Sequence, residues 1–284
     1  MRPKTLPAAV APLLVAIALS VQSPYPVSLP LVILAMLCSL TLQILVNFAN
    51  DYSDAKSGVD TDKRVGPTRA TQSGLIAEQQ MFRAICITAT LAICFGLPLV
   101  IAGGVYLAVV GVLCVIAALA YSGGPFPLAS NALGEITVFV FFGLVAVVGG
   151  TYLFTGLVLP HVWYMATICG LPISAIMLVN NTRDIQTDAL ANKNTLSVRV
   201  GRSMANRIFL ALLTMPLLVA LVAWLQSPAL WTWPIASALT LPFALRLSRA
   251  FNAANGASFN PLLGQTSQFC LWTSILYSCA ILIA

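Results

Sequence analysis

The sequence predicts an all-α, polytopic membrane protein with about nine transmembrane helices. Hydrophobic residues make up 59% of the 284 residues, charged residues make up 8%, and the mean hydropathy is +0.93. So few polar groups could not cover the surface of a soluble domain of this length. Runs such as 29–46 and 137–150 are apolar on every side, whereas the strands of a membrane barrel alternate polar and apolar residues. The spans are therefore expected to be helices.

Each expected helix is an apolar stretch of roughly 20 residues, the length that crosses a bilayer, bounded by charges, prolines or glycines. Connections near 23–27, 101–103, 156–161 and 226–229 carry no Lys or Arg, and the charged residues lie in or beside the connections on the opposite side. In chain order, the spans are expected near 6–22, 28–50, 80–101, 103–122, 132–155, 160–181, 204–225, 229–247 and 266–284. Residues 1–284 are expected to form one domain with a loose internal repeat of 1–130 and 131–265.

The basic residues predict the orientation of these spans. All 14 Lys and Arg residues fall in the N-terminus or in or beside alternate connections. Positively charged loops stay in the cytoplasm, so the N-terminus is expected inside and Ala284 outside. The net charge of +6 is thus explained by topology, with a lipid bilayer as the partner. No soluble basic domain suggests nucleic-acid binding.

Most of the acid lies in two short runs, 47–64 and 180–193, each at the end of an apolar span. Of the 8 Asp and Glu residues in the chain, the runs hold Asp51, Asp54, Asp60, Asp62, Asp184 and Asp188. Carboxylates crowded at a membrane surface repel one another and are costly to desolvate, which favours a divalent metal as their counter-charge. Wet connectors are also polar, but they rarely repeat the same acid spacing.

The spacing within each run places the polar residues on one helix face. Asn47, Asp51 and Asp54 are spaced i, i+4, i+7, and Asn180, Asp184 and Asp188 are spaced i, i+4, i+8. Two such faces across a bundle would supply the oxygen ligands that Mg²⁺ prefers together with phosphate oxygens.

Basic residues flank the acids on the same predicted side, and they would take up the surplus charge of a metal-bound diphosphate. They are Lys63, Arg64, Arg69, Arg183, Lys193 and Arg199. Glu135, early in the fifth span, is either a functional carboxylate or a partner for a neighbouring helix. Tyr121 could contact a substrate or anchor the fourth span at the interface.

Several motifs resemble the UbiA superfamily of intramembrane prenyltransferases, whose members carry two Asp-rich motifs on nine transmembrane helices. The resemblance spans nearly the whole chain, through RPKTLPAAVAP, NDYSDAKSGVDTD, GPTRATQSGLI, YSGGPFPL, LGEITVFVFFG, NNTRDIQTDALANKNTLSVRVG and NPLLGQT. The superfamily's first motif, Asn-x-x-x-Asp-x-x-x-Asp, maps onto Asn50, Asp54 and Gly58, so its last acid is missing. The menaquinone branch resembles NDxxDxxxGxD instead, which fits Asn50, Asp51, Asp54, Gly58 and Asp60.

A second feature separates the branches. The 4-hydroxybenzoate branch resembles YPxxKR after the fourth span, whereas this chain has YSGGPFPL without a cation. The resemblance therefore implies transfer of a polyprenyl group from polyprenyl diphosphate to 1,4-dihydroxy-2-naphthoate with decarboxylation, giving demethylmenaquinone. It also implies a location in the bacterial cytoplasmic (inner) membrane, with the active site facing the cytoplasm.

The resemblance assigns roles to individual residues. Two Mg²⁺ ions would be held by Asp51, Asp54, Asp60, Asp184 and Asp188. The expected catalytic residues are Asp51, Asp54, Asp184, Asp188 and Lys193. The expected substrate-binding residues are Asn47, Asn50, Arg69, Tyr121, Asn180 and Arg183.

Three alternatives remain open from the sequence. A related prenyltransferase could use another aromatic acceptor. A secondary transporter would more often carry its charges near the bilayer midplane. A CDP-alcohol phosphotransferase would share the Mg²⁺–diphosphate chemistry, but its motif is not found around Asp51 or Asp184.

Overall fold

The predicted all-α fold class is confirmed. The computed structural model describes residues 5–56, 66, 70–71 and 73–284, apart from the side chain of Asp54. These residues form helices and turns and no strand. Six of the helical segments among them are long and apolar enough to cross a membrane. The chain is therefore a multi-pass membrane protein.

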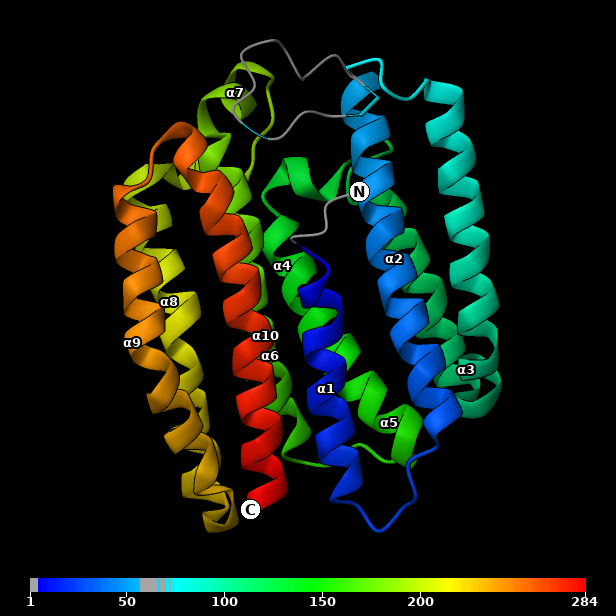
Figure 1. Cartoon of the computed structure of the whole chain (residues 1–284), viewed down its shortest axis with the longest axis vertical. Helices are drawn as coiled ribbons and strands as arrows, with labels where there is room; N and C mark the ends of the chain where they lie inside the picture. The colour runs from blue at the N-terminus through cyan, green and yellow to red at the C-terminus, as the bar shows by residue number, and fades with distance from the viewer. Residues whose placement is uncertain (1–4, 57–65, 67–69, 72) are drawn as a thin grey trace.

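The helices pack side by side into one bundle (Figure 1). The bundle places α8 and α9 on one side and α2 and α3 on the other, with α1, α6 and α10 between them. The main helices are α1 (Pro7–Val21), α2 (Leu29–Lys56), α3 (Glu78–Ala120), α6 (Val162–Arg183), α7 (Ile185–Leu190), α8 (Leu196–Gln226), α9 (Thr232–Ala253) and α10 (Phe259–Ile283).

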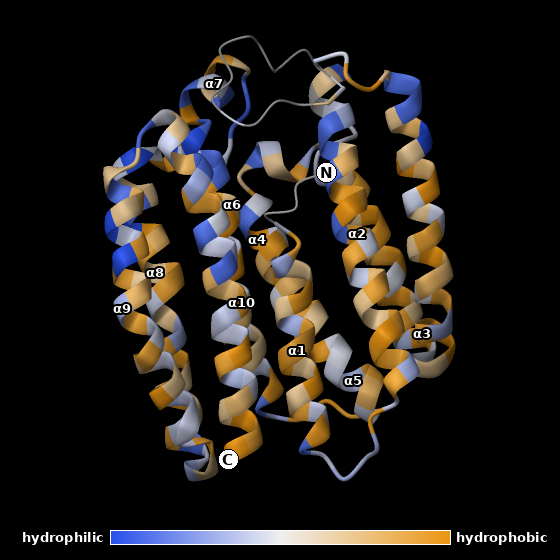
Figure 2. Ribbon diagram, viewed as in Figure 1, coloured by the Kyte–Doolittle hydropathy of each residue, from blue (hydrophilic) through white to orange (hydrophobic). Residues whose placement is uncertain are grey.

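Hydrophilic residues gather at the end of the bundle that carries α7 and the C-terminal end of α2 (Figure 2). We call this the motif end, because Asp51 and Asp184 lie in or beside these helix ends. Ala284 lies at the opposite end (Figure 1). This separation agrees with the sequence-based expectation that the acidic runs and the C-terminus lie on opposite sides.

The third and fourth expected spans form two limbs of α3. Gly104 between them has φ 70° and ψ −159°, which is not helical. Residues with a Cβ are strained at such a φ, whereas glycine is not. The chain therefore turns at a glycine that the sequence places between two apolar stretches. The total of nine spans stays a prediction, since α1 and α9 fall outside the six segments that meet the length and hydropathy criteria.

Four helices extend beyond their expected boundaries at the motif end, and one of them, α9, continues to Ala253 although its span was expected to end near 247. α2 continues to Lys56, α8 begins at Leu196 and α10 begins at Phe259, whereas the spans were expected to end near 50 and to begin near 204 and 266. The start of α8 is capped by Thr195, whose hydroxyl accepts a hydrogen bond from the Val198 N–H at 3.4 Å. Hydropathy located the membrane-spanning part of each helix and missed the polar turns that continue beyond it.

The fifth expected span is a composite of α4 (Gly134–Val138), a π-helical segment η3 (Phe139–Gly149) and α5 (Gly150–Thr155). Within it, η3 packs closely on α6 at two glycines. A Cβ on Gly143 would lie 2.8 Å from the Gly170 Cα and 2.9 Å from the Ala166 carbonyl oxygen. Only glycine permits this approach, and it brings the aromatic residues of η3 against α6.

The glycine contact gives a first prediction. Gly143→Ala should lower the free energy of unfolding by about 2 kcal/mol, because the backbone of α6 leaves no room for a methyl group. Gly149→Ala, in the same segment, is the matched control, since a Cβ there would meet nothing within 4 Å. Thermal unfolding of the purified variants in detergent measures both. Equal loss of stability in the two variants would contradict the assigned contact.

Candidate functional site

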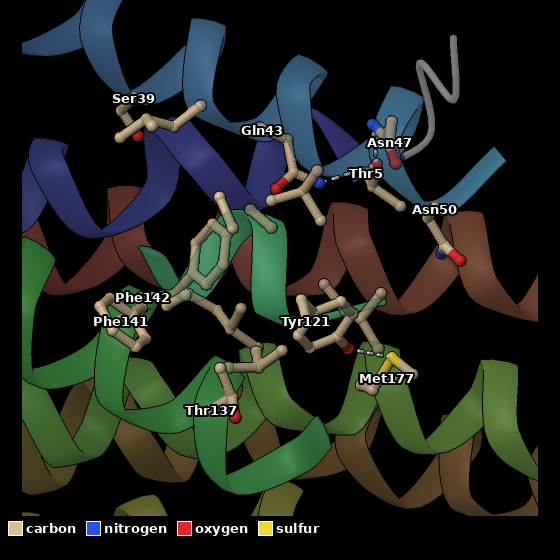
Figure 3. A pocket seen from close by; sticks show the side chains of 18 of the residues that line it. Thr5, Ser39, Gln43, Asn47, Asn50, Tyr121, Thr137, Phe141, Phe142 and Met177 are labelled. Atoms are coloured by element: carbon tan, nitrogen blue, oxygen red, sulfur yellow. Dashed lines mark hydrogen bonds between the residues drawn. The ribbon is translucent and has the colours of Figure 1, made fainter. Parts of the chain in front are cut away.

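A cavity of about 180 Å³ lies within the bundle, between α2 and the pair formed by η3 and α6. Polar side chains line one part of it, and Phe141 and Phe142 of η3 line another (Figure 3). Thr5 and Ala8, near the start of the chain, also line the cavity. The cavity thus joins a polar region to an apolar region.

Asparagines from both predicted motifs line this one cavity. Asn47 and Asn50 come from α2, and Asn180 comes from α6. These two helices are separated by more than a hundred residues in the sequence. The expectation that the two polar runs converge on one place is therefore supported for their asparagines.

In the first motif, Asp51 holds the backbone of residues 70–71. Its Oδ2 accepts a hydrogen bond from the Ala70 N–H at 3.2 Å, and its Oδ1 accepts one from the Thr71 N–H at 3.3 Å. Asp60 and Arg69 lie outside the described residues, as does the side chain of Asp54. Their assigned roles stay predictions.

In the second motif, the expectation that Asn180, Asp184 and Asp188 share one face of a single helix is wrong. α6 ends at Arg183, and Asp184 has the non-helical angles φ −95° and ψ 11°. Asp188 belongs to the short helix α7, although its N–H still donates to the Asp184 carbonyl oxygen at 2.8 Å. The chain therefore turns within the motif and buries Asp188.

Arg183 connects three polar residues around this turn. Its Nε donates to Asp184 Oδ1 at 2.8 Å, and its Nη2 donates to Asp184 Oδ2 at 2.6 Å. The same guanidinium donates to Asn180 Oδ1 at 2.9 Å and to Asn260 Oδ1 of α10 at 3.1 Å. A fork-to-fork pair of this kind fixes the carboxylate strongly. The Arg183 and Asp184 side chains are only 3% and 14% exposed.

The donor atoms suit Mg²⁺, although the described residues do not assemble a complete metal site. Carboxylate and amide oxygens from Asp51, Asp184, Asp188 and the three asparagines are the hard ligands that this ion takes. No group of three or more His, Cys, Asp or Glu side chains comes together within the described part of the chain. The site as predicted also includes Asp54 and Asp60, whose side chains lie outside that part.

Lys193 follows the second motif and is held next to it by its backbone. Its N–H donates to the Asp188 carbonyl oxygen at 2.9 Å. The next residue, Asn194, donates its N–H to the Ser130 carbonyl oxygen at 2.9 Å. The loop after α7 is thereby tied to the segment that precedes α4.

Tyr121 lies in the cavity wall and is not an exposed interfacial anchor. Its side chain is buried, and its hydroxyl donates to the Met177 Sδ of α6 at 2.8 Å (Figure 3). Its expected contact with a substrate stays a prediction, and its place in the cavity wall fits that role.

Glu135 pairs with a neighbouring helix. Its Oε1 accepts a hydrogen bond from the Asn181 Nδ2 at 2.8 Å, and its backbone carbonyl accepts one from the Ser174 hydroxyl at 3.1 Å. Both partners belong to α6, which also supplies Asn180 to the cavity. Glu135 thus joins α4 to the helix that bears the second motif.

Sequence reasoning missed several cavity residues, among them Thr5, Gln43, Thr137 and Met177. One of them had a signal in the sequence. Gln43 lies one helical turn before Asn47, so it extends the polar face of the first motif deeper into an apolar helix. The others are small or apolar residues that any membrane helix contains.

The family model described as the UbiA prenyltransferase family matches residues 9–277. The chain belongs to this family. It is 38% identical to the 1,4-dihydroxy-2-naphthoate octaprenyltransferase of Escherichia coli K12, over 98% of this chain and 92% of that protein. It is 34% identical to the protein of the same name from Haemophilus influenzae, over 99% of this chain and 94% of that protein.

Solved structures of UbiA homologues share the fold. One, from Archaeoglobus fulgidus, is bound to DMAPP and Mg²⁺ and aligns with a TM-score of 0.73 at 15% identity, covering 100% of this chain and 97% of that one. The apo structure of a homologue from Aeropyrum pernix aligns with a TM-score of 0.72 at 16% identity, covering 100% and 98%. The helical bundle of this chain is therefore a UbiA-type bundle.

The Arg183–Asp184 pair gives a second prediction. Arg183→Met should lower the free energy of unfolding by about 3 kcal/mol, because it leaves a largely buried carboxylate without its counter-charge. Adding Asp184→Asn to that variant should recover part of the loss, since an amide carries no charge. Denaturation of the single and double variants in detergent measures this coupling. Losses that simply add would contradict it.

Proposed function

We propose that this chain transfers a polyprenyl group from polyprenyl diphosphate to 1,4-dihydroxy-2-naphthoate, with loss of the carboxyl group as CO₂. The product would be a demethylmenaquinone, which makes the chain an enzyme of menaquinone biosynthesis. The named relatives from Escherichia coli and Haemophilus influenzae, each similar over nearly its full length, support this acceptor. The sequence YSGGPFPL, without the cations of the 4-hydroxybenzoate branch, supports it independently.

One structural observation carries the proposal. A single cavity begins at the asparagines of both motifs and continues to Phe141 and Phe142. A polyprenyl diphosphate has the same two parts, a polar head and a hydrocarbon tail. The head would lie beside Asn50 and Asn180, and the tail would extend between the aromatic side chains of η3 and away from water.

The metal ligands are proposed from both motifs. Asp51, Asp54, Asp60, Asp184 and Asp188 would hold Mg²⁺, and Asn47 and Asn50 would assist through their amide oxygens. When bound, Mg²⁺ would offset the negative charge of the diphosphate. The structure of the Archaeoglobus fulgidus homologue with DMAPP and Mg²⁺ supports this use of a divalent ion.

The residues of the chain itself then orient the reactants. Arg183 holds the Asp184 carboxylate through two hydrogen bonds, and Asn260 holds the other side of the guanidinium. Lys193 and Arg69 would stabilise the charge that grows on the leaving diphosphate as the allylic C–O bond loosens. Tyr121, whose hydroxyl donates to Met177, would present its ring to the carbon on which positive charge develops. The electron-rich naphthoate ring attacks that carbon.

The proposed location is the bacterial cytoplasmic membrane, with the N-terminus and the motif end facing the cytoplasm. The bacterial relatives and the six apolar helical segments support the membrane. The placement of every basic residue in the N-terminus or in or beside alternate connections supports the orientation.

A test of the acceptor compares two ring substrates in membranes that contain this enzyme. We expect prenylation of 1,4-dihydroxy-2-naphthoate and at least about a hundredfold less product from 4-hydroxybenzoate, because the second ring fits a branch with different polar residues. Mass spectrometry of the quinone product reports ring and tail together. Prenylation of 4-hydroxybenzoate alone would overturn the assigned acceptor.

A test of the metal role compares two acids. Asp188→Asn should lower kcat by about a hundredfold or more, because an amide binds Mg²⁺ much more weakly than a carboxylate does. Glu78→Gln, at an exposed acid at the start of α3, is the control and should keep its activity. EDTA should stop the wild-type reaction, and excess Mg²⁺ should restore it. Full activity of the Asp188 variant would remove that residue from the metal site.

A further inference from the structure

Gln43 places an amide in the wall of the cavity, within the apolar part of α2. Its side chain is only 8% exposed. Figure 3 shows its nitrogen directed toward Thr5 and its oxygen on the side of the cavity. An amide is costly at this depth of a membrane helix unless both of its ends find partners. The nitrogen has a partner in the chain, and the oxygen faces the space that a substrate would fill.

Thr5 determines which end of the amide faces the cavity. The Thr5 hydroxyl oxygen accepts a hydrogen bond from Gln43 Nε2 at 3.1 Å and a weaker one from Asn47 Nδ2 at 3.5 Å. Two amide nitrogens therefore share one hydroxyl oxygen. The start of the chain, which precedes α1, thus holds the Gln43 oxygen as an acceptor within the cavity.

A hydrogen-bond acceptor in this position distinguishes between the two substrates. An isoprenoid tail has no donor and would leave the buried oxygen without a partner. A dihydroxynaphthoate has two phenolic O–H groups, and either can donate. Gln43 precedes Asp51 by eight residues, which is about 12 Å along the axis of a helix. That separation leaves room for the diphosphate at the motif end and for the ring at the level of Gln43.

We propose that Gln43 is a specificity-determining residue that accepts a hydrogen bond from a phenolic hydroxyl of the acceptor, and that Thr5 is its positioning residue. This inference rests on the proposed function and adds a contact to the ring. Thr5, near the start of the chain, thereby contributes to selection of the dihydroxy ring, because its hydroxyl orients the Gln43 amide. The carboxyl end of the acceptor takes no part in this contact.

The test separates binding of the ring from binding of the tail. Gln43→Leu keeps the size of the side chain and removes the acceptor, so the KM for 1,4-dihydroxy-2-naphthoate should rise about tenfold. The KM for polyprenyl diphosphate should stay within twofold of wild type. Thr41→Val is the matched control on the same helix, because its hydroxyl donates to the Leu37 carbonyl oxygen and it is not part of the cavity wall. That variant should keep both KM values.

A pair of Thr5 variants tests the positioning role and decides the matter alone if Gln43→Leu does not accumulate in membranes. Thr5→Val should raise the KM for the naphthoate about threefold, and Thr5→Ser, which keeps the hydroxyl, should restore the wild-type value. Equal KM values in Thr5→Val and Thr5→Ser would contradict the role of the hydroxyl.

Competitive inhibition by 1-hydroxy-2-naphthoate and 4-hydroxy-2-naphthoate identifies the hydroxyl involved. The compound that lacks it should bind wild type and Gln43→Leu equally, whereas the other should bind wild type about tenfold more tightly. An unchanged naphthoate KM in Gln43→Leu, or a rise only in the KM for polyprenyl diphosphate, would overturn the inference. Failure of the proposed function would be visible separately, as wild-type enzyme that does not prenylate the naphthoate.

Discussion

Hydrocarbon provides no hydrogen bonds, so each polar group inside this bundle needs a partner from the chain or from a ligand. The helices satisfy the backbone, and pairs between helices satisfy most of the buried side chains described above. Glu135 bonds to Asn181, Tyr121 bonds to Met177, and Thr5 bonds to Gln43. Each pair connects elements that are distant in the sequence, and each lies in or near the wall of the cavity. The cost of an unpaired polar group therefore shapes both the bundle and the site.

At the motif end, one arginine provides the hydrogen-bond partner for several polar side chains. Arg183 bonds to Asp184 and Asn180 at the end of α6 and to Asn260 at the start of α10. In the structure it fixes the carboxylate of the second motif, and its expected contact with the diphosphate stays a prediction. Two hydrogen bonds from the guanidinium hold the Asp184 carboxylate in one orientation before any ligand arrives. The same guanidinium also bonds to Asn180, which lines the neighbouring cavity.

Much of the fold could be predicted because hydropathy acts over whole helices. The apolar stretches gave the membrane class and the approximate position of each span, and the glycines near residue 104 marked the turn within α3. The helix ends were less accurate, because α8 and α10 begin with polar turns that hydropathy assigns to loops. The π-helical segment and the contact between Gly143 and Gly170 had no signal, since they depend on how closely two helices approach.

The sequence alone determined that the chain spans a membrane, that its acids and amides form two runs, and which family those runs resemble. These properties depend on residue type and spacing along the chain. Only the tertiary structure decided that Asn47, Asn50 and Asn180 share one cavity, that Arg183 bonds to Asp184, and that Thr5 orients Gln43. These contacts depend on the relative rotation and depth of packed helices, which a helical sequence pattern specifies only to within a face.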